Sequence, residues 1–192
     1  SMTVARRFDP QRLLRVLTTH DVRFVLIGGW AAVLHGSPTV TVDLDICYDR
    51  SPANLERLAS ALTELEVRLR GFPPDLPFAI DARALRSGDV FTLTTSAGDL
   101  DLLGAPAGVG GYEDLVRGAL ELVLDDITLR VASIDDLIRM KIAAGRPKDL
   151  IEIPILEPET FDVEMTRQLL ADNGLQAACS LGLSRETDVA SE

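Results

Sequence analysis

The sequence contains few of the residues that build disulfide frameworks, zinc sites and aromatic cores. Its 192 residues include two cysteines, two histidines and two lysines, and aromatic residues make up 5%. Two cysteines do not make a disulfide framework, and two histidines argue against a zinc site. We therefore expect a cytoplasmic protein whose core is built from Leu, Val, Ile and Ala.

Long apolar runs and an excess of positive charge are also missing. No run approaches the roughly 20 residues of a membrane span, and no signal peptide is visible, so we expect no membrane partner. The net charge of −11 argues against non-specific wrapping of nucleic acid, although a local basic groove could still take an RNA end. A hydrophobic content of 46% is ample for one domain with a small helical appendage.

One stretch near the N-terminus carries a pattern typical of a phosphate site. The apolar run 24–27 predicts a buried strand, and Gly28 and Gly29 then end the strand and open a short helix. The first turn of a helix exposes unpaired N–H groups at the positive end of the helix dipole, and glycine lets a phosphate approach them closely. Alone, two glycines are most often a plain turn.

The next predicted strand, 41–47, carries two acidic residues. Asp43 and Asp45 are two residues apart, so both carboxylates lie on one face while Leu44 and Ile46 lie on the other. Two carboxylates on one face repel each other unless a cation lies between them. Hard oxygen ligands beside a phosphate site favour Mg²⁺.

A later hairpin carries two further acidic residues, either of which can supply a third carboxylate. Residues 90–95 have strand composition, 96–98 form a hairpin turn, and 99–103 form the second strand of the hairpin. Asp99 and Asp101 share a face of the returning strand. Asp101 has Leu on both sides and is the preferred third carboxylate, with Asp99 as the alternative.

Hydrophobic periodicity and capping residues predict the remaining elements and the domain organisation. Helices are expected over 9–17, 28–35, 51–64, 79–85, 112–117, 133–144 and 159–173, and strands over 22–27, 41–47, 67–69, 90–95, 99–103, 121–124 and 127–131. The predicted organisation is a core over 1–132, a helical part packed on the core over 133–179, and a disordered tail over 180–192. His35 is expected to end a helix with its side chain bonded to nearby backbone.

The glycine turn followed by Asp-x-Asp on the next strand resembles the signature of the nucleotidyltransferase fold of DNA polymerase β type. The resemblance implies an α+β fold, with a mixed sheet flanked by helices and followed by C-terminal helices. It also implies an Mg²⁺-dependent enzyme that uses an NTP.

A basic segment later in the chain extends the resemblance. The only two lysines lie seven residues apart, and the second precedes an acid, giving K-x₆-K-D. Alone, this segment would be a solvated corner between helices. Together with G-G-x-A, H-G and D-x-D, it resembles the AbiEii/MenT group of nucleotidyltransferase-like toxins over roughly residues 22–157.

The resemblance assigns a role to each matching residue. It implies two Mg²⁺ ions at Asp43 and Asp45, with Asp101 as third ligand or general base. The triphosphate is expected on Gly28 and Gly29. Phosphate contacts are expected from Lys141, with Arg146 and Lys148 as further candidates, and Asp149 is expected as a polar residue of the active site. Thr41 stands where some relatives have a Ser that can be phosphorylated, so a kinase acting there is a further implied partner. Thr39 departs from the Arg that relatives often carry, which puts nucleotide affinity or choice in doubt.

The implied function is a toxin that transfers NMP from an NTP, CTP before the others, to an RNA acceptor. The implied acceptor is the tRNA 3′ end, so that translation is blocked, and a cognate antitoxin is the implied regulator. Two alternatives stay open. One is a nucleotidyltransferase acting on a small molecule such as a cationic antibiotic, which suits the acidic balance. The other is a non-catalytic binding module of the same fold.

Overall fold

Seven strands form one mixed sheet in the part of the chain that the structure describes. The computed structural model describes residues 7–73 and 75–146, and the sheet order is β3-β4-β5-β2-β1-β7-β6. The strands are β1 (Phe24–Ile27), β2 (Asp43–Tyr48), β3 (Arg68–Leu69), β4 (Val90–Thr95), β5 (Gly98–Leu103), β6 (Leu120–Leu124) and β7 (Ile127–Val131). The predicted α+β class with a mixed sheet is confirmed.

The centre of the sheet mixes parallel and antiparallel pairs. β2 lies between β1, to which it is antiparallel, and β5, to which it is parallel. β4 and β5 form an antiparallel hairpin, which β3 extends, and β6 and β7 form a second hairpin whose β7 runs parallel to β1. The two strands expected to carry the acidic residues are therefore direct neighbours in register.

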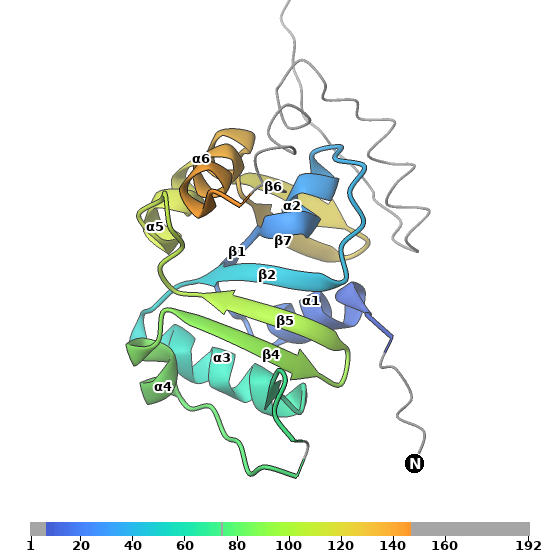
Figure 1. Ribbon diagram of the computed structural model, residues 1–192, viewed down its shortest axis with the longest axis vertical. Coiled ribbons are helices and arrows are strands. Elements are labelled where there is room, and N and C mark those ends of the chain that lie inside the picture. The colour runs from blue at the N-terminus through green and yellow to red at the C-terminus, as the bar shows by residue number, and fades with distance from the viewer. Residues whose placement is uncertain (1–6, 74, 147–192) are drawn as a thin grey trace, which may run out of the picture.

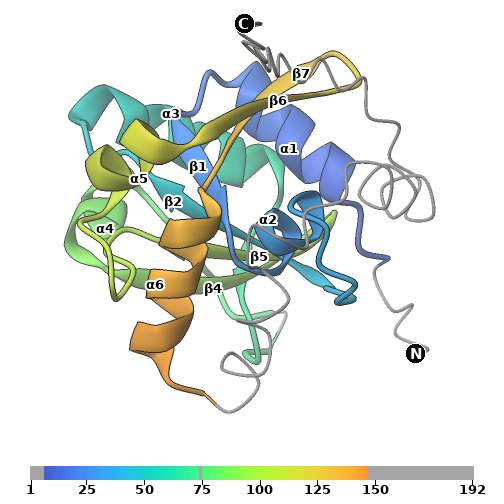
Figure 2. The same ribbon diagram turned by 90° about the horizontal axis from the view of Figure 1, so that it is seen from above.

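Helices cover the sheet on both sides. They are α1 (Pro10–Thr19), α2 (Gly28–Leu34), α3 (Pro52–Glu64), α4 (Ala82–Ser87), α5 (Tyr112–Gly118) and α6 (Ile134–Ala144). Figure 1 shows α3 and α4 on one side of β4 and β5, with α2 and α6 on the other side of β2. From above, the β6–β7 hairpin passes beside α1 (Figure 2). None of the helices within the described ranges is long and apolar enough to cross a membrane.

A large part of the core lies on one face of β2 and β5. Leu44 and Ile46 of β2 and Leu100 and Leu102 of β5 are fully buried, and they alternate with the acidic residues of the same strands. Leu55, Leu58 and Leu62, on one side of α3, are fully buried in the same core. Burying these leucines therefore fixes which face of each strand is left for polar groups.

Capping residues set the helix ends that the sequence predicts. The Asp9 carboxylate accepts the Arg12 N–H at 3.0 Å, and the Ser133 hydroxyl accepts the Asp136 N–H at 3.1 Å. Gly145 ends α6 in the left-handed region with φ +63°. Each group satisfies a helix-end N–H or lets the chain leave the helix without strain.

Several predicted boundaries differ from the structure by one to three residues, such as β1, which begins at Phe24 rather than residue 22, and two of the differences have a visible local reason. β2 begins at Asp43 rather than residue 41, because the Thr41 hydroxyl bonds back to Asp43 and takes the chain out of the pairing. α4 begins at Ala82 rather than residue 79, because the Asp81 carboxylate caps it by accepting the Ala84 N–H at 2.8 Å. The predicted helix 159–173 and tail 180–192, and most of the predicted helical part 133–179, lie outside the described residues.

His35 behaves as the sequence predicts. It is buried at the end of α2, and its Nε2 lies 2.7 Å from the carbonyl oxygen of Ala132. Burial lowers its pKa, so the imidazole is neutral and its Nε2–H donates to that carbonyl. The bond ties α2 to the end of β7 and leaves His35 a structural role.

Candidate functional site

Four carboxylates line up on one face of the two neighbouring strands β2 and β5. Asp43 lies opposite Asp99, and Asp45 lies opposite Asp101 in the parallel register. Adjacent strands are about 4.8 Å apart, so the side chains of each pair are close neighbours. The pairing brings together the three carboxylates that the sequence singles out, and Asp101 rather than Asp99 lies beside Asp45.

Asp45 is the carboxylate with the most perturbed environment. Burial, reinforced by the charges of Asp43 and Asp101, raises its pKa to about 7. The Gly29 N–H acts in the opposite direction by donating to this carboxylate. This N–H belongs to the first turn of α2, so Asp45 caps a helix that has no side-chain cap of its own. The described residues therefore stabilise the ionised form of Asp45 only in part, and this carboxyl gains or loses its proton near neutral pH.

The two glycines at the start of α2 are needed for close packing against these residues. Gly28 has φ +68°, and a Cβ built on it would lie 2.3 Å from Oδ2 of Asp45. A Cβ on Gly29 would lie 2.8 Å from Oγ1 of Thr41. Both distances are shorter than any normal contact. Gly28 and Gly29 thus make room for Asp45 and Thr41, in addition to any role toward a phosphate.

Thr41 positions Asp43. Its hydroxyl lies 3.0 Å from Oδ1 of Asp43 and 3.2 Å from the backbone oxygen of the same residue. The hydroxyl donates one proton, which these two acceptors share. A phosphate on this hydroxyl would bring about two negative charges next to Asp43.

Arg70, which the sequence analysis does not single out, bridges the two carboxylates of β5. Its Nε lies 3.1 Å from Oδ2 of Asp99, and its Nη2 lies 2.6 Å from Oδ1 of Asp101. The same Nη2 donates to the carbonyl oxygen of Leu93 at 3.0 Å. Burial raises the pKa of Asp101, and the Arg70 charge and hydrogen bond oppose that rise.

A cleft of about 650 Å³ opens beside the carboxylates. Its lining includes the predicted residues Gly28, Gly29, Thr41, Asp43, Asp45, Asp101, Lys141 and Arg146. Val40 and Val42 also line it and are 84% and 68% exposed. The cleft therefore has an acidic wall, an edge with Lys141 and Arg146, and exposed apolar side chains. The predicted residues Lys148 and Asp149 lie outside the described part of the chain.

The donor set suits a hard divalent cation, but the side chains of residues 7–73 and 75–146 do not form a complete cage. Asp43, Asp45 and Asp101 offer carboxylate oxygens only, which are the ligands Mg²⁺ prefers. Within those ranges, no group of three or more His, Cys, Asp or Glu side chains is placed to hold a metal ion. Asp43 and Asp45 fit as ligands, whereas Oδ1 of Asp101 is already bonded to the guanidinium of Arg70.

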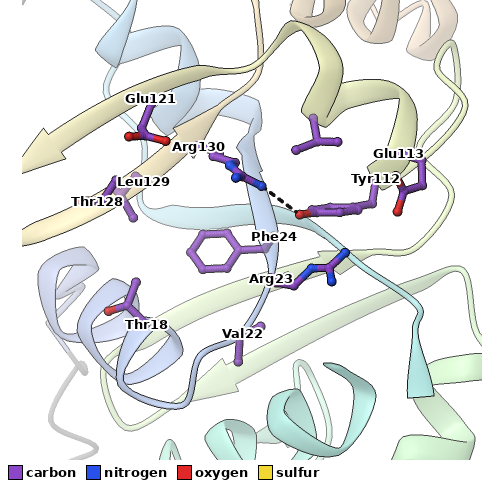
Figure 3. Close-up of a pocket in the computed structure, with 11 residues that line it drawn as sticks. Thr18, Val22, Arg23, Phe24, Tyr112, Glu113, Glu121, Thr128, Leu129 and Arg130 are labelled. Carbon is purple, nitrogen blue, oxygen red and sulfur yellow. Dashed lines mark hydrogen bonds between the residues drawn. The ribbon is translucent and has the colours of Figure 1, made fainter. Parts of the chain in front are cut away.

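A second cavity of about 540 Å³ lies at the opposite end of β1. In Figure 3, Arg130 reaches across it to the Tyr112 hydroxyl, to which it donates at 3.4 Å. Arg23 lies 5.7 Å from the centre of the Tyr112 ring and pairs with Asp49 at 2.9 Å. Glu113 and Glu121 line the same cavity, so its charges are mixed. None of the predicted site residues within the described ranges lines this cavity.

Two solved structures share this arrangement of elements. The antibiotic-resistance factor ANT(2'')-Ia, in complex with adenylyl-2''-tobramycin, is 17% identical over 85% of this chain and 93% of that chain, with a TM-score of 0.50. A protein of Thermotoga maritima assigned as a nucleotidyltransferase is 14% identical over 76% of this chain and 88% of that chain, also with a TM-score of 0.50. At such identities the likeness establishes the fold. The chain has the nucleotidyltransferase fold.

Sequence comparison gives only short matches. No family model matches the chain. A stretch of 44 residues is 52% identical to a ketose 3-epimerase of Arthrobacter globiformis, covering 23% of this chain and 15% of the epimerase. A stretch of 49 residues is 49% identical to an L-ribulose 3-epimerase of Methylomonas sp. (strain DH-1), covering 26% and 17%. The chain thus spans less than a fifth of the length of these curated relatives, and these short matches assign no activity to it.

Proposed function

We propose that the protein is an Mg²⁺-dependent nucleotidyltransferase that transfers NMP from an NTP to an acceptor hydroxyl. The observation that carries the proposal is the in-register pairing of Asp45 with Asp101, beside Asp43 and the glycine turn, at the wall of one cleft. Partly buried carboxylates that lie close together repel one another, so a cation beside Asp43 and Asp45 would stabilise a cluster in which Arg70 neutralises Asp99 and Asp101.

The proposed reaction needs no covalent enzyme intermediate. The acceptor oxygen attacks the α-phosphorus, the bond from that phosphorus to the bridging oxygen breaks, and pyrophosphate leaves with the electron pair. A divalent cation on the carboxylates supplies charge neutralisation at the phosphates and lowers the pKa of the attacking hydroxyl. Asp101 is proposed either as the third metal ligand or as the base that takes the hydroxyl proton.

Other residues take positioning roles in the proposal. Lys141 on α6 and Arg146 just after it line the cleft and are proposed to contact the phosphates. Thr41 holds Asp43, and Gly28 and Gly29 admit the triphosphate. Lys148 and Asp149 keep the phosphate-contact and polar roles that the sequence resemblance implies.

An RNA end, that of tRNA in particular, is the first acceptor that we propose. The support is the resemblance of the Lys141–Asp149 segment to nucleotidyltransferase-like toxins. Exposed Val40 and Val42 at the cleft add apolar surface on which a base can rest. The proposed toxin role and the proposed antitoxin depend on the same resemblance, and both require that the protein modifies an RNA acceptor.

A small cationic molecule is the second candidate acceptor. Four aspartates share the site face against one bridging arginine, so the acidic wall attracts cations. ANT(2'')-Ia, whose fold this chain shares, has been solved in complex with adenylyl-2''-tobramycin. An aminoglycoside-like polyamine therefore serves as the comparison substrate.

A transfer assay with labelled nucleotides tests the proposal. The protein is mixed with Mg²⁺, each α-labelled NTP in turn, and either total tRNA or an aminoglycoside. We expect label on one acceptor class with wild type, and a loss of about 1,000-fold with Asp43→Ala, because the variant removes a proposed metal ligand.

Thr18→Ala is the matched control, since Thr18 lies on α1 and lines the second cavity rather than the site. Label on tRNA alone supports the RNA acceptor, and label on the aminoglycoside alone supports the small molecule. The proposal fails if folded wild type labels neither acceptor and calorimetry detects no Mg²⁺-dependent NTP binding.

A further inference from the structure

The position of Arg70 has a geometric cause in the sheet. The Arg70 N–H bonds to the carbonyl of Thr92 at 3.1 Å, Thr92 pairs with Asp101, and Asp101 pairs with Asp45. One row therefore runs across the sheet from Arg70, just after β3, through Thr92 of β4 and Asp101 of β5 to Asp45 of β2. The Thr92 side chain is short, so the long Arg70 side chain can pass over it to reach Asp101.

The neighbouring row places the second partner of Arg70. Thr94 of β4 pairs with Asp99, and its hydroxyl donates to Oδ1 of Asp99 at 3.0 Å. The other oxygen, Oδ2, faces Nε of Arg70. One guanidinium therefore hydrogen-bonds Asp101 and forms an ion pair with Asp99, a two-sided contact that the planar guanidinium provides and a lysine ammonium does not.

The side chains of the Arg70–Asp101 pair are partly exposed to solvent. The Arg70 side chain is 30% exposed, and the Asp101 side chain is 17% exposed. A cation entering the cleft would find Asp101 already paired with Arg70. The guanidinium occupies Oδ1 of Asp101, and its positive charge opposes the binding of a divalent cation to the same carboxylate.

We propose that Arg70 is a counter-cation that holds Asp101 in the metal-free protein and competes with a metal ion for this carboxylate. The proposal rests on the metal role of the carboxylates in the proposed function. Arg70 is thus a positioning residue: it stabilises the empty cluster of carboxylates, and it weakens metal binding in the absence of nucleotide.

Arg70→Gln tests this by direct ion binding. We expect Mn²⁺, measured without nucleotide by calorimetry and by its EPR signal, to bind at least about 10-fold more tightly than to wild type, because Asp101 no longer has a competing cation. Arg70→Lys keeps the charge but loses the two-sided contact, and should tighten binding about 3-fold. Arg12→Gln, an exposed arginine of α1, removes the same charge elsewhere and should leave the affinity unchanged.

Thermal unfolding supplies a second readout. In EDTA, Arg70→Gln should melt at a lower temperature than wild type, since its carboxylates have lost their partner. Saturating Mn²⁺ should restore the melting temperature of this variant to the wild-type value or above. If Arg70 had a purely structural role, Mn²⁺ would raise the melting temperatures of the variant and of wild type by the same amount.

A double-variant cycle locates the competition at Asp101. In an Asp101→Asn background, Arg70→Gln should no longer tighten Mn²⁺ binding, because the contested carboxylate is gone. Equal or weaker Mn²⁺ binding by Arg70→Gln, with wild type binding the ion, would overturn the role of Arg70 and leave the proposed function standing. Absence of Mn²⁺ binding by both proteins, even with an NTP, would instead defeat the proposed function.

Discussion

Replacing Asp45 by Asn is expected to abolish nucleotidyl transfer while making the metal-free protein more stable at pH 8. Asn has nearly the same shape as a protonated Asp, and its amide oxygen can still accept the Gly29 N–H that Asp45 now binds. It cannot supply a negative charge to a metal ion. We expect a loss in kcat of about 1,000-fold or more.

The gain in stability follows from the raised pKa of Asp45. Burial and the neighbouring Asp43 and Asp101 raise this pKa from 3.8 to about 7, so the folded state binds the proton more tightly than the unfolded state. That stabilisation is complete below pH 3.8 and is lost as the pH rises through about 7. Ionisation of Asp45 therefore lowers the free energy of unfolding by up to about 4 kcal/mol. We expect to observe about 1–3 kcal/mol between Asp45→Asn and wild type at pH 8.

Urea unfolding in EDTA from pH 5 to pH 8 measures this effect. Wild type should lose stability across the range relative to Asp45→Asn, and the difference between the two proteins should become smaller toward pH 5. Saturating Mg²⁺ at pH 8 should stabilise wild type and leave the variant unchanged. Asp99→Asn is the matched control: it removes one charge from the same face, but Asp99 does not line the cleft.

Two results would contradict this account of Asp45. One is an Asp45→Asn variant that is less stable than wild type at pH 8, which would mean that the ionised carboxylate stabilises α2 through the Gly29 N–H. The other is transfer activity that survives in Asp45→Asn at a level like that of Asp99→Asn.

Local patterns were enough to predict the carboxylate face. The alternation of Asp43 and Asp45 with Leu44 and Ile46 is a property of any strand with one buried side, and the structure has it. Caps at Asp9 and Ser133 and the stop at Gly145 are equally local, so the helices next to them were predictable.

Long-range pairing could not be predicted in the same way. The separate acidic strands, β2 and β5, are parallel neighbours only because β1 and β2 are antiparallel and β5 enters the sheet from a hairpin with β4. No spacing in the sequence states the register that sets Asp45 opposite Asp101. The resemblance to a known fold supplied that expectation.

Arg70 shows where residue patterns fall short. Arg68 and Arg70 alternate with Leu69, which is the signal of a short strand with one polar face. That signal does not say that Arg70 lies one strand beyond Thr92 and reaches Asp101. The ion pair between Arg70 and Asp101 depends on the order of β3, β4 and β5, which only the folded sheet defines. The sequence of one short strand therefore gave no reason to place Arg70 in the site.

Gly28→Ala is expected to destabilise the protein by about 3–5 kcal/mol and to reduce transfer below about 1% of wild type. Two effects combine. Gly28 has φ +68°, where alanine is strained, and a Cβ there would lie 2.3 Å from Oδ2 and 2.6 Å from Cγ of Asp45. The new methyl group must therefore displace the carboxylate on which the proposed chemistry depends.

Gly71→Ala separates the two effects. Gly71 has φ +82°, and a Cβ on it would meet nothing within 4 Å. This control therefore measures backbone strain alone, for which we expect about 1–2 kcal/mol and unchanged transfer activity. The excess destabilisation of Gly28→Ala over Gly71→Ala, read from urea unfolding, is the energy of the collision with Asp45.

Asp45→Ala in the Gly28→Ala background tests the assignment of that excess. Removing the carboxylate leaves only the contact between the new Cβ and Cβ of Asp45, at 2.8 Å, so stability should recover in part. Transfer should not recover, because the proposed metal ligand is gone. Equal stability of Gly28→Ala and Gly71→Ala would show that α2 can shift away from β2. The glycine would then serve only the backbone turn, and the close approach of α2 to Asp45 would lose its proposed importance for catalysis.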